Sequence, residues 1–282
     1  MPLRSTDVRR RFERAAKSFD DFDFVHAVTR DGLFSRLEPM TVDAKRVVDL
    51  GCATGAASKS LAKRFRGAQI IGIDQSPAML REAARKKPWF TKCSFVEADA
   101  TSIPLEDHSV DVVFCNQLLP WIDEVPALFT EVNRILRKEG LFMFASLGPD
   151  SLAELRAAWH SVDEGAHVHY FADMHNIGDA AVRAGLTDPV LDVDRLKIRY
   201  EDPAALLRDL TGSAARNCLD DRRQSLTGKN RFAALESALR NTANPAGIEL
   251  DLELVYGHCW GSGSQAGTGE VRIGLNQIGR RN

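Results

Sequence analysis

The segment from Arg46 to Gly55 combines a run of β-branched residues, a carboxylate and closely spaced small residues. The apolar run predicts a buried strand, and Gly51 and Gly55 let the main chain turn tightly and approach a ligand that a Cβ atom would hold away. A dinucleotide site has the spacing G-x-G-x-x-G, with a helix start facing a pyrophosphate. Here the frame is Asp49-x-Gly51-x-Ala53-x-Gly55, and a carboxylate before the glycines repels a diphosphate but suits an ammonium group. The loop therefore predicts a nucleotide-type cofactor with a positive charge, bound at the carboxyl edge of a parallel sheet.

Carboxylates also follow the next two predicted strands. Asp74 ends the run 69–74, at the distance where an acidic side chain accepts from both hydroxyls of a ribose. Asp99 and Ala100 follow the run 93–97 and offer a carboxylate and a backbone amide to an adenine edge. Each carboxylate alone is also consistent with a helix cap or a turn. Three carboxylates at three successive strand ends indicate a single nucleoside site.

Three more residues are candidate cofactor contacts. Gln75 directly follows the second strand, and Asn116 ends a fourth, 110–116. Met79 either packs on the ribose or adenine or belongs to the core face of its helix.

Strands and helices alternate through the first half of the chain, which indicates a parallel sheet with right-handed crossovers. Residues 5–36 are expected to form two helices over the cofactor cleft, with Val8, Phe12 and Phe19 on one face. The expected strands are 46–50, 69–74, 93–97, 109–115 and 140–147, and the expected helices between them are 55–65, 77–86 and 125–137.

The pattern changes after Gly148, where helices become dominant. Helices are expected at 150–162, 175–184, 203–216 and 228–240, and strands at 190–200 and 250–256. The helices between these two strands form an insertion placed to cap the site and select the substrate. The predicted units are a helical segment 1–40, a core 41–200, a cap 201–245, a last strand 246–260 and a flexible Gly/Ser-rich tail 261–282.

The composition argues against several classes of function. The chain has 282 residues, 44% of them hydrophobic, and a formal net charge of −2, which gives no support to nucleic-acid binding. No apolar run is long enough to cross a membrane, and the arginines at 4, 9, 10 and 11 precede no apolar signal region. The five cysteines form no CxxC pair, and His167, His169 and His175 lack companions with metal-ligand spacing, so no metal site is expected. These features favour a cytoplasmic protein.

Residues 46–147 resemble the class I S-adenosylmethionine-dependent methyltransferases. The longer stretch from Val8 to Trp260 resembles a narrower group, the biotin-synthesis malonyl-[acyl-carrier protein] O-methyltransferases. The motifs of the narrower resemblance are Arg11-Phe-x-x-Ala-Ala-Lys-Ser-Phe19, Ser146-Leu-Gly-Pro-Asp-Ser-Leu-Ala-Glu-Leu-Arg156, the run from His167 to Asp179, Leu207-Arg-Asp-Leu210 and Val255-Tyr-Gly-His-Cys-Trp260.

The broader resemblance implies an α/β, Rossmann-like fold: a seven-stranded, mostly parallel sheet with an antiparallel last strand, a helical N-terminal segment and a helical cap. The narrower one implies transfer of the methyl group of S-adenosyl-L-methionine to the free carboxylate of malonyl-acyl carrier protein, early in the pimelate and biotin pathway. A malonyl carboxylate is already ionised near neutral pH, so no general base is needed. The site must instead align the carboxylate and exclude water. The candidate orienters are His167, His169, Tyr170, Phe19, Trp121 and an arginine of the cap.

The chain departs from the family pattern at two positions. Ala53 stands where glycine is usual, and its methyl group costs little if the residue keeps a negative φ. Phe19 stands where tyrosine is common and cannot donate a hydrogen bond. Both departures would suit a non-catalytic binding module that keeps the fold. A second alternative is an enzyme with another acceptor, such as the related complex I assembly factors, which are described as protein-arginine hydroxylases.

Carrier-protein docking, which the narrower resemblance implies, needs basic residues that face an acidic helix. Each basic residue taken singly is also consistent with a solvated surface. The candidates are Arg195, Lys197 and Arg199 on one predicted strand, and Arg208, Arg222, Arg223, Lys229 and Arg231 in the cap.

Overall fold

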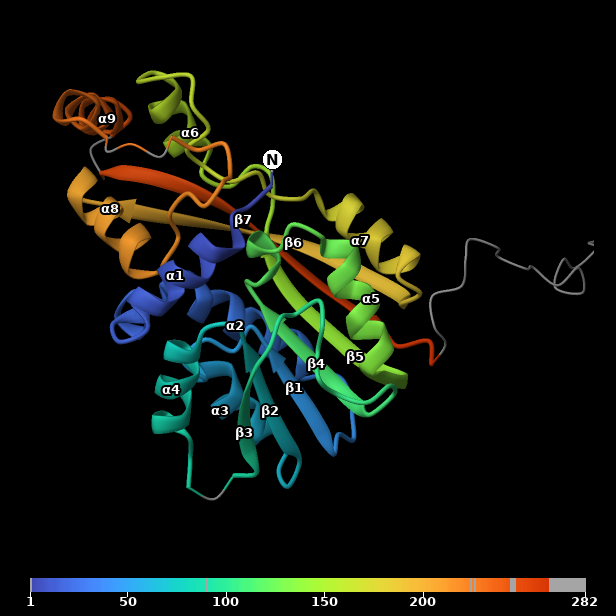
Figure 1. Ribbon diagram of the computed structural model, residues 1–282. Coiled ribbons are helices and arrows are strands. Elements are labelled where there is room, and N and C mark those ends of the chain that lie inside the picture. The colour runs from blue at the N-terminus through green and yellow to red at the C-terminus, as the bar shows by residue number, and fades with distance from the viewer. Residues whose placement is uncertain (1, 90, 224, 226, 244–246, 264–282) are drawn as a thin grey trace, which may run out of the picture.

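A central sheet organises the protein (Figure 1). The computed structural model describes residues 2–89, 91–223, 225, 227–243 and 247–263. The strands are β1 Arg46–Leu50, β2 Gln69–Asp74, β3 Cys93–Glu97, β4 Val110–Asn116, β5 Leu136–Leu147, β6 Thr187–Tyr200 and β7 Ile248–Trp260. They form one seven-stranded sheet in the order β3-β2-β1-β4-β5-β7-β6.

Strand direction follows the expected pattern. β1 pairs in parallel with β2 and β4, β2 with β3, and β4 with β5. β7 runs antiparallel to both of its neighbours, β5 and β6. The prediction of a mostly parallel sheet with an antiparallel last strand is therefore confirmed. Because β3, β2 and β1 are adjacent, their carboxyl ends meet at one edge of the sheet.

Helices cover both faces of this sheet (Figure 1). They are α1 Ser5–Ala15, η1 Phe19–Asp21, α2 Phe24–Leu37, α3 Ala56–Arg64, α4 Pro77–Lys86, η2 Leu119–Trp121, α5 Val125–Ile135, α6 Ala153–His160, α7 Met174–Arg183, α8 Pro203–Gly212 and α9 Lys229–Asn241, where η marks short 3₁₀ turns.

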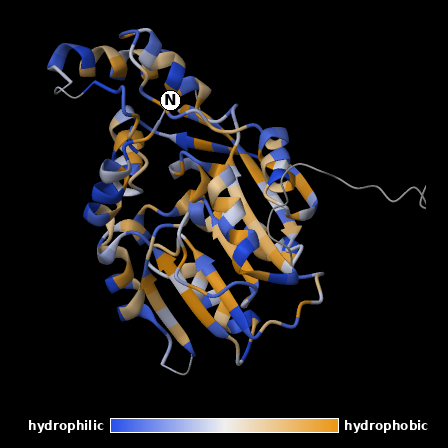
Figure 2. Ribbon diagram, turned by 45° about the vertical axis from the view of Figure 1, so that its right-hand side comes forward, coloured by the Kyte–Doolittle hydropathy of each residue, from blue (hydrophilic) through white to orange (hydrophobic). Residues whose placement is uncertain are grey.

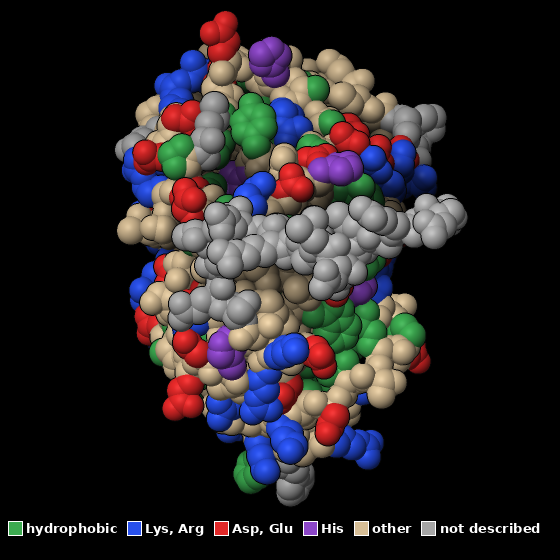
Figure 3. Space-filling view, turned by 90° about the vertical axis from the view of Figure 1, so that its right-hand side faces the viewer, with side chains coloured by type: hydrophobic (Ala, Val, Ile, Leu, Met, Phe, Trp, Pro, Cys, Tyr) green, Lys and Arg blue, Asp and Glu red, His purple; other side chains and the backbone are tan. Residues whose placement is uncertain are grey.

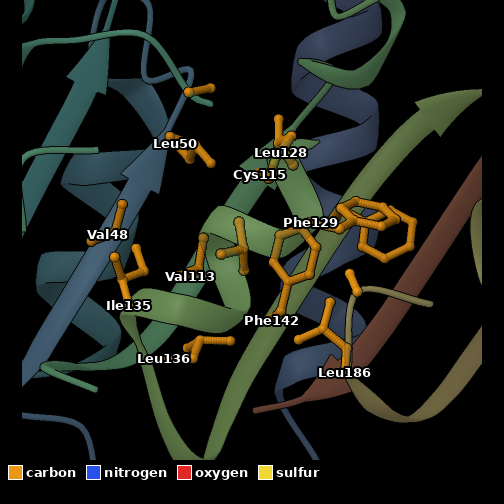
Figure 4. Packing of buried hydrophobic residues seen from close by; sticks show 14 of the residues in the cluster. Val48, Leu50, Val113, Cys115, Leu128, Phe129, Ile135, Leu136, Phe142 and Leu186 are labelled. Atoms are coloured by element: carbon orange, nitrogen blue, oxygen red, sulfur yellow. The ribbon is translucent and has the colours of Figure 1, made fainter. Parts of the chain in front are cut away.

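Alternating side chains along the strands supply two separate cores. Val48 and Phe142 face Phe129 of α5, with α7 completing that layer (Figure 4). The neighbouring Val47 faces the opposite side, where Leu33 of α2 and Leu61 of α3 pack. Hydrophobic residues accordingly concentrate in the strands (Figure 2).

The cap helices α6, α8 and α9 lie beyond the C-terminal end of β6 and the N-terminal end of β7 (Figure 1), and a third hydrophobic cluster forms among them. These two strands have 14 and 13 residues, longer than the parallel strands, and they carry the cap helices α6, α8 and α9. Leu155 of α6 packs with Leu206 of α8 and Leu235 of α9. The cap therefore draws on α6, which the sequence pattern grouped with the core, as well as on the insertion 201–245.

Several boundaries differ from the sequence pattern. β5 begins at Leu136, directly after α5, rather than at 140. α6 begins at 153 rather than 150 because Leu152 is left-handed, with φ +59°, and interrupts the helix. The predicted tail lies outside the described residues from position 264 onward. Within the described ranges, no helix combines the length and apolarity that a membrane span requires.

Candidate active site

The loop between β1 and α3 turns through three left-handed residues. The φ angle is +73° at Gly51, +44° at Ala53 and +82° at Gly55. The backbone N–H groups of Gly51 and Cys52 donate to the carbonyl of Ile73 at 2.8 and 3.0 Å, which fixes the loop against β2. The condition under which the Ala53 methyl group would cost little, a negative φ, is therefore not met. The left-handed region brings a Cβ atom close to the following carbonyl oxygen, at a cost of roughly 1–2 kcal/mol.

Asp49 lies beneath this loop, with its residue surface only 1% exposed. Its Oδ2 accepts a hydrogen bond from the Ser58 hydroxyl at 2.5 Å, at the start of α3. Burial, together with the nearby charge of Asp74, raises the pKa of Asp49 to about 6. A carboxylate with a pKa raised in this way is stabilised in its charged form by a cationic group nearby. The direct contact with a ligand ammonium group stays a prediction.

Asp74 and Asp99 follow the next two strands along the same edge. Asp74 accepts from the backbone N–H of Ala53 at 3.0 Å and from that of Ser76 at 2.8 Å, so it joins the glycine loop to the start of α4. Burial raises the pKa of Asp74. Asp99 is exposed and accepts from the backbone N–H and hydroxyl of Thr101. The structure therefore brings the carboxylates to adjacent strand ends, and their contacts with ribose and adenine stay predictions.

The N-terminal segment is fastened over the glycine loop. Asp20 accepts from the Thr54 hydroxyl at 2.5 Å and pairs with Lys86 of α4 at 2.6 Å. Beside it, Phe19 is buried in a cluster with Met79. Asp20 and Thr54 are 34 positions apart in the chain. No local pattern in the sequence predicts this contact.

Three buried polar atoms without hydrogen-bond partners gather beyond β4. They are Asn116 Oδ1, Gln117 Nε2 and His26 Nδ1. Asn116 Nδ2 donates to the carbonyl of His26 at 2.9 Å, which brings α2 to the end of β4. Burial and the nearby Arg30 lower the pKa of His26 to about 4, so its ring is neutral at pH 7. Buried polar atoms are normally paired, so these three fit a bound polar ligand. Sequence reasoning had singled out only Asn116 of this group.

A cavity of about 1220 Å³ opens beside these residues, between the sheet edge and the cap. Gln117 and His26 line it near β4, while Leu155 of α6 and Phe232 of α9 line it within the cap. Its wall is largely apolar, with arginines distributed around it. This shape and lining suit an elongated acceptor that carries an anionic group.

Two predicted orienters, Trp121 and His169, line this cavity together. Their rings meet edge to face, with centroids 5.0 Å apart. One ring nitrogen of His169, Nε2, accepts from the backbone N–H of Cys218 at 2.8 Å. The ring also hydrogen-bonds the carbonyl of Pro120, and burial lowers the pKa of His169 to about 4. With both nitrogens engaged, His169 shapes the wall and has no N–H left to donate to an acceptor.

The other predicted orienters lie elsewhere. His167 lines the cavity within the cap, stacked on Trp159 at 3.8 Å and hydrogen-bonded to Asp163 at 2.6 Å. Tyr170 is 66% exposed and does not line the cavity. Phe19 is also absent from the cavity wall and packs against His26, with ring centroids 5.1 Å apart. We therefore retain Trp121 and His167 as cavity residues and leave Tyr170 out of the orienters. Over the described part of the chain, no cluster of His, Cys, Asp and Glu side chains could hold a metal ion.

Comparison with known proteins agrees with this geometry. Residues 48–144 match the family model described as a methyltransferase domain. The chain is 39% identical to the malonyl-[acyl-carrier protein] O-methyltransferase of Halorhodospira halophila, over 97% of this chain and 95% of that protein. It is 38% identical to the protein of the same name from Legionella pneumophila, over 87% and 88% of the two chains.

Solved structures share the fold at low sequence identity. The YcgJ protein of Bacillus subtilis is 17% identical, with a TM-score of 0.60 over 81% of this chain and 96% of that one. Phosphoethanolamine N-methyltransferase 2 of Haemonchus contortus, in complex with S-adenosyl-L-methionine, is 16% identical, with a TM-score of 0.53 over 88% and 57% of the two chains. The sheet, its helical layers and the loop after β1 are therefore those of a class I methyltransferase fold.

Proposed function

The chain belongs to the malonyl-[acyl-carrier protein] O-methyltransferase family, and on this premise we propose that it methylates the free carboxylate of a malonyl thioester on acyl carrier protein, with S-adenosyl-L-methionine as the methyl donor. The reaction belongs to the early pimelate part of biotin synthesis. The observation that carries the proposal is a large cavity roofed by the cap, whose wall includes Gln117 just after β4, the strand that pairs with β1 and so lies beside the nucleoside-type loop. The similarity to the relatives extends over this cap as well as the common core.

The loop residues fit the methyl donor. Gly51 and Gly55 take left-handed conformations that bring the backbone close to a ligand. In this proposal Asp74 and Asp99 contact the ribose and adenine, and Gln75, Ala100 and Met79 are further contacts of the nucleoside. Asp49 supplies negative charge beneath the loop, which suits the positive charges of the donor. When bound, S-adenosyl-L-methionine supplies a methyl group already activated by its positive sulfur.

The residues around the acceptor need only hold it and exclude water. A malonyl carboxylate is ionised at neutral pH, so no side chain has to remove a proton. The geometry is consistent with this requirement, because His26 and His169 have pKa values lowered to about 4 and His169 has both nitrogens engaged. Trp121 and the apolar cap residues enclose the acceptor, which favours alignment over reaction with water.

Fewer basic residues are candidates for the proposed carrier-protein surface than the sequence suggested. On β6, Arg195 pairs with Asp150 at 2.8 Å and Lys197 with Glu249 at 3.1 Å. Arg199 also pairs with Glu249. Acidic partners therefore neutralise much of this strand, and on the face shown in Figure 3 basic and acidic side chains are likewise interspersed. The exposed cations at the cavity, such as Arg208 and Arg223, are the better candidates for meeting an acidic carrier.

The test is incubation of the protein with labelled S-adenosyl-L-methionine and malonyl-acyl carrier protein, followed by mass spectrometry. One added methyl ester on the malonyl group is expected. Malonyl-coenzyme A is run in parallel to decide which thioester is the preferred acceptor. A folded protein that binds the donor but leaves both thioesters unmethylated would contradict the proposed reaction. The two alternatives considered from the sequence, an arginine hydroxylase and a non-catalytic module, gain no support from the relatives found.

A further inference from the structure

The acceptor cavity contains one arginine whose position differs from that of the others. The arginines that line the cavity are Arg11, Arg199, Arg208, Arg216, Arg222, Arg223 and Arg231. Four of them, Arg199, Arg208, Arg216 and Arg223, are exposed to solvent. Arg222 forms an ion pair with the buried Asp7, and Arg231 lies 3.8 Å from Asp163. Arg11 remains: it is partly buried, and no ion pair to it is found among the described residues.

The guanidinium group of Arg11 is only partly satisfied by the protein. Its Nη2 donates to the backbone carbonyl of Asn217 at 2.8 Å. Its Nε is buried and has no hydrogen-bond partner in the described structure. One Nη of Arg222 and one of Arg231 are also without a hydrogen-bond partner, but those two arginines have a carboxylate nearby. Burial lowers the pKa of Arg11, although an arginine stays charged at neutral pH. A partly buried cation with a free N–H group is stabilised by an anion that enters the cavity.

Arg11 lies near His169, at the side of the cavity that Trp121 also lines. It precedes Phe12 on α1, and the Phe12 ring meets Trp121 edge to face at 5.2 Å. Trp121 in turn meets His169, whose pKa the charge of Arg11 helps to lower. Trp121 belongs to the segment that follows β4, and Gln117 of the same segment also lines the cavity. The anion that Arg11 attracts therefore binds near the end of β4, the sheet edge to which the methyl donor is assigned.

We propose that Arg11 is the specificity-determining cation for the acceptor carboxylate, an inference that rests on the proposed function. The guanidinium group binds one carboxylate oxygen, while the second oxygen remains available to accept the methyl group. Because the methyl ester is neutral, it lacks the charge that Arg11 recognises. The same residue thus favours entry of the anionic acceptor and release of the product. The expectation from the sequence was an arginine of the cap, whereas this one comes from the N-terminal helix.

The test compares the wild-type protein with Arg11→Gln and Arg11→Lys. Steady-state kinetics with a small malonyl thioester and calorimetry with S-adenosyl-L-methionine separate acceptor from donor binding. Arg11→Gln is expected to raise KM for the malonyl thioester by about tenfold or more, since a hydrogen bond between charged groups is lost. Donor affinity is expected to stay within about twofold, and Arg11→Lys is expected to recover part of the loss. The matched control is Arg14→Gln, an exposed arginine one turn away on the same helix.

Binding of the product gives an independent readout. The wild-type protein is expected to bind the malonyl thioester at least about tenfold more tightly than its methyl ester, and Arg11→Gln is expected to bind the two nearly equally. Equal binding of the two compounds by the wild-type protein overturns the proposal without any variant, so a variant that fails to fold does not leave it undecided. Unchanged discrimination in a folded Arg11→Gln protein overturns it as well. If the wild-type protein methylates no malonyl thioester, it is the proposed function that fails.

Discussion

Asp49 is the residue whose ionisation the structure constrains most directly at the cofactor site. Its pKa is raised to about 6, mainly by burial, from an ordinary value of 3.8. The folded state therefore holds a proton that the unfolded state has released, and the stability from this group is present below about pH 4 and lost as pH rises through about 6. A bound cation reverses this preference because it favours the charged carboxylate.

This ionisation predicts a pH-dependent affinity for the donor. The dissociation constant of S-adenosyl-L-methionine is expected to fall several-fold between about pH 5 and about pH 7, as Asp49 ionises. Asp49→Asn is expected to weaken binding at pH 7 and to flatten the dependence. Isothermal titration across this range measures both. A variant that keeps the wild-type slope would show that another group titrates.

The left-handed conformation of Ala53 gives a second prediction for a single residue. Its φ of +44° disfavours any side chain with a Cβ atom, and a β-branched side chain is disfavoured most. Ala53→Gly removes a cost of roughly 1–2 kcal/mol but adds freedom to the unfolded chain worth about 0.5–1 kcal/mol. Chemical denaturation is expected to rank the free energies of unfolding as Ala53→Gly at or above wild type, and Ala53→Val clearly below it. If Ala53→Gly were less stable than the wild-type protein by more than about 1 kcal/mol, the left-handed conformation would not carry the expected cost.

Site residues could be predicted where their position follows from local order. The common sheet edge of Asp49, Asp74 and Asp99 could be predicted because parallel strands align their carboxyl ends, while their contacts with the donor stay predictions. The sequence did not reveal that Arg11, Gln117 and His26 line the cavity, because this depends on contacts between distant segments. The sign of φ at Ala53 could not be read from the sequence for a related reason. It is set by the hydrogen bonds of the loop to β2 and Asp74, not by the residue itself.

Among the elements, the N-terminal segment offers the clearest test of how the site is closed. Asp20 holds η1 to Thr54 of the cofactor loop and to Lys86 of α4. Asp20→Ala is expected to weaken donor binding by about three- to tenfold, because hydrogen bonds to charged groups contribute a few kcal/mol at most. Its effect on the thermal unfolding midpoint is expected to be small, since the residue is exposed. Calorimetry with the donor and a thermal melt test the two expectations.

The control for this change lies on the same segment. Glu13 of α1 pairs with Arg9 on the surface at 3.1 Å and makes no contact with the loop in the described structure. Glu13→Gln is expected to leave donor affinity unchanged. Comparable losses of donor affinity in Asp20→Ala and Glu13→Gln would mean that the N-terminal segment responds to any change of charge. The Asp20 contact would then have no special role.

Whether a segment forms a helix or a strand could be predicted well from the sequence. Which other elements it packs against could be predicted less well. β-branched runs such as 69–74 favour buried strands in a sheet covered on both faces, and the structure has a strand there. Leu155 of α6, in contrast, follows the core strands in sequence yet packs with Leu235 of α9 in the cap. Helical periodicity indicates that a face is buried but not which distant face it meets.

For the whole molecule, two long strands connect cofactor binding to substrate selection. β6 and β7 are part of the main sheet along most of their length and extend beyond it to hold α6, α8 and α9. The cavity therefore has one wall from the sheet edge and another from the cap. This arrangement explains why the first half of the sequence indicated only the fold class, while the substrate class depended on motifs after residue 146.

The exposed arginines at the cavity predict how the carrier protein is recognised. Arg222, which the sequence suggested as a docking residue, forms an ion pair with the buried Asp7, so reversing its charge would damage the fold. Arg208 and Arg223 are exposed at the cavity and are the better choice. The double variant Arg208→Glu with Arg223→Glu is expected to raise KM for malonyl-acyl carrier protein by about five- to tenfold at low salt, because exposed charges steer encounter.

Two comparisons decide whether this effect reports docking. KM for a small malonyl thioester is expected to change by less than about twofold in the double variant, because that substrate has no acidic carrier to steer. The carrier-protein effect is expected to shrink as salt is added, since the charges are exposed to solvent. Arg183→Glu serves as the control: Arg183 lies on α7, outside the lining of the cavity, and pairs only loosely with Asp179 at 3.9 Å. If KM rises equally for both substrates in the double variant Arg208→Glu with Arg223→Glu, the arginines act on the cavity itself and the carrier protein docks elsewhere.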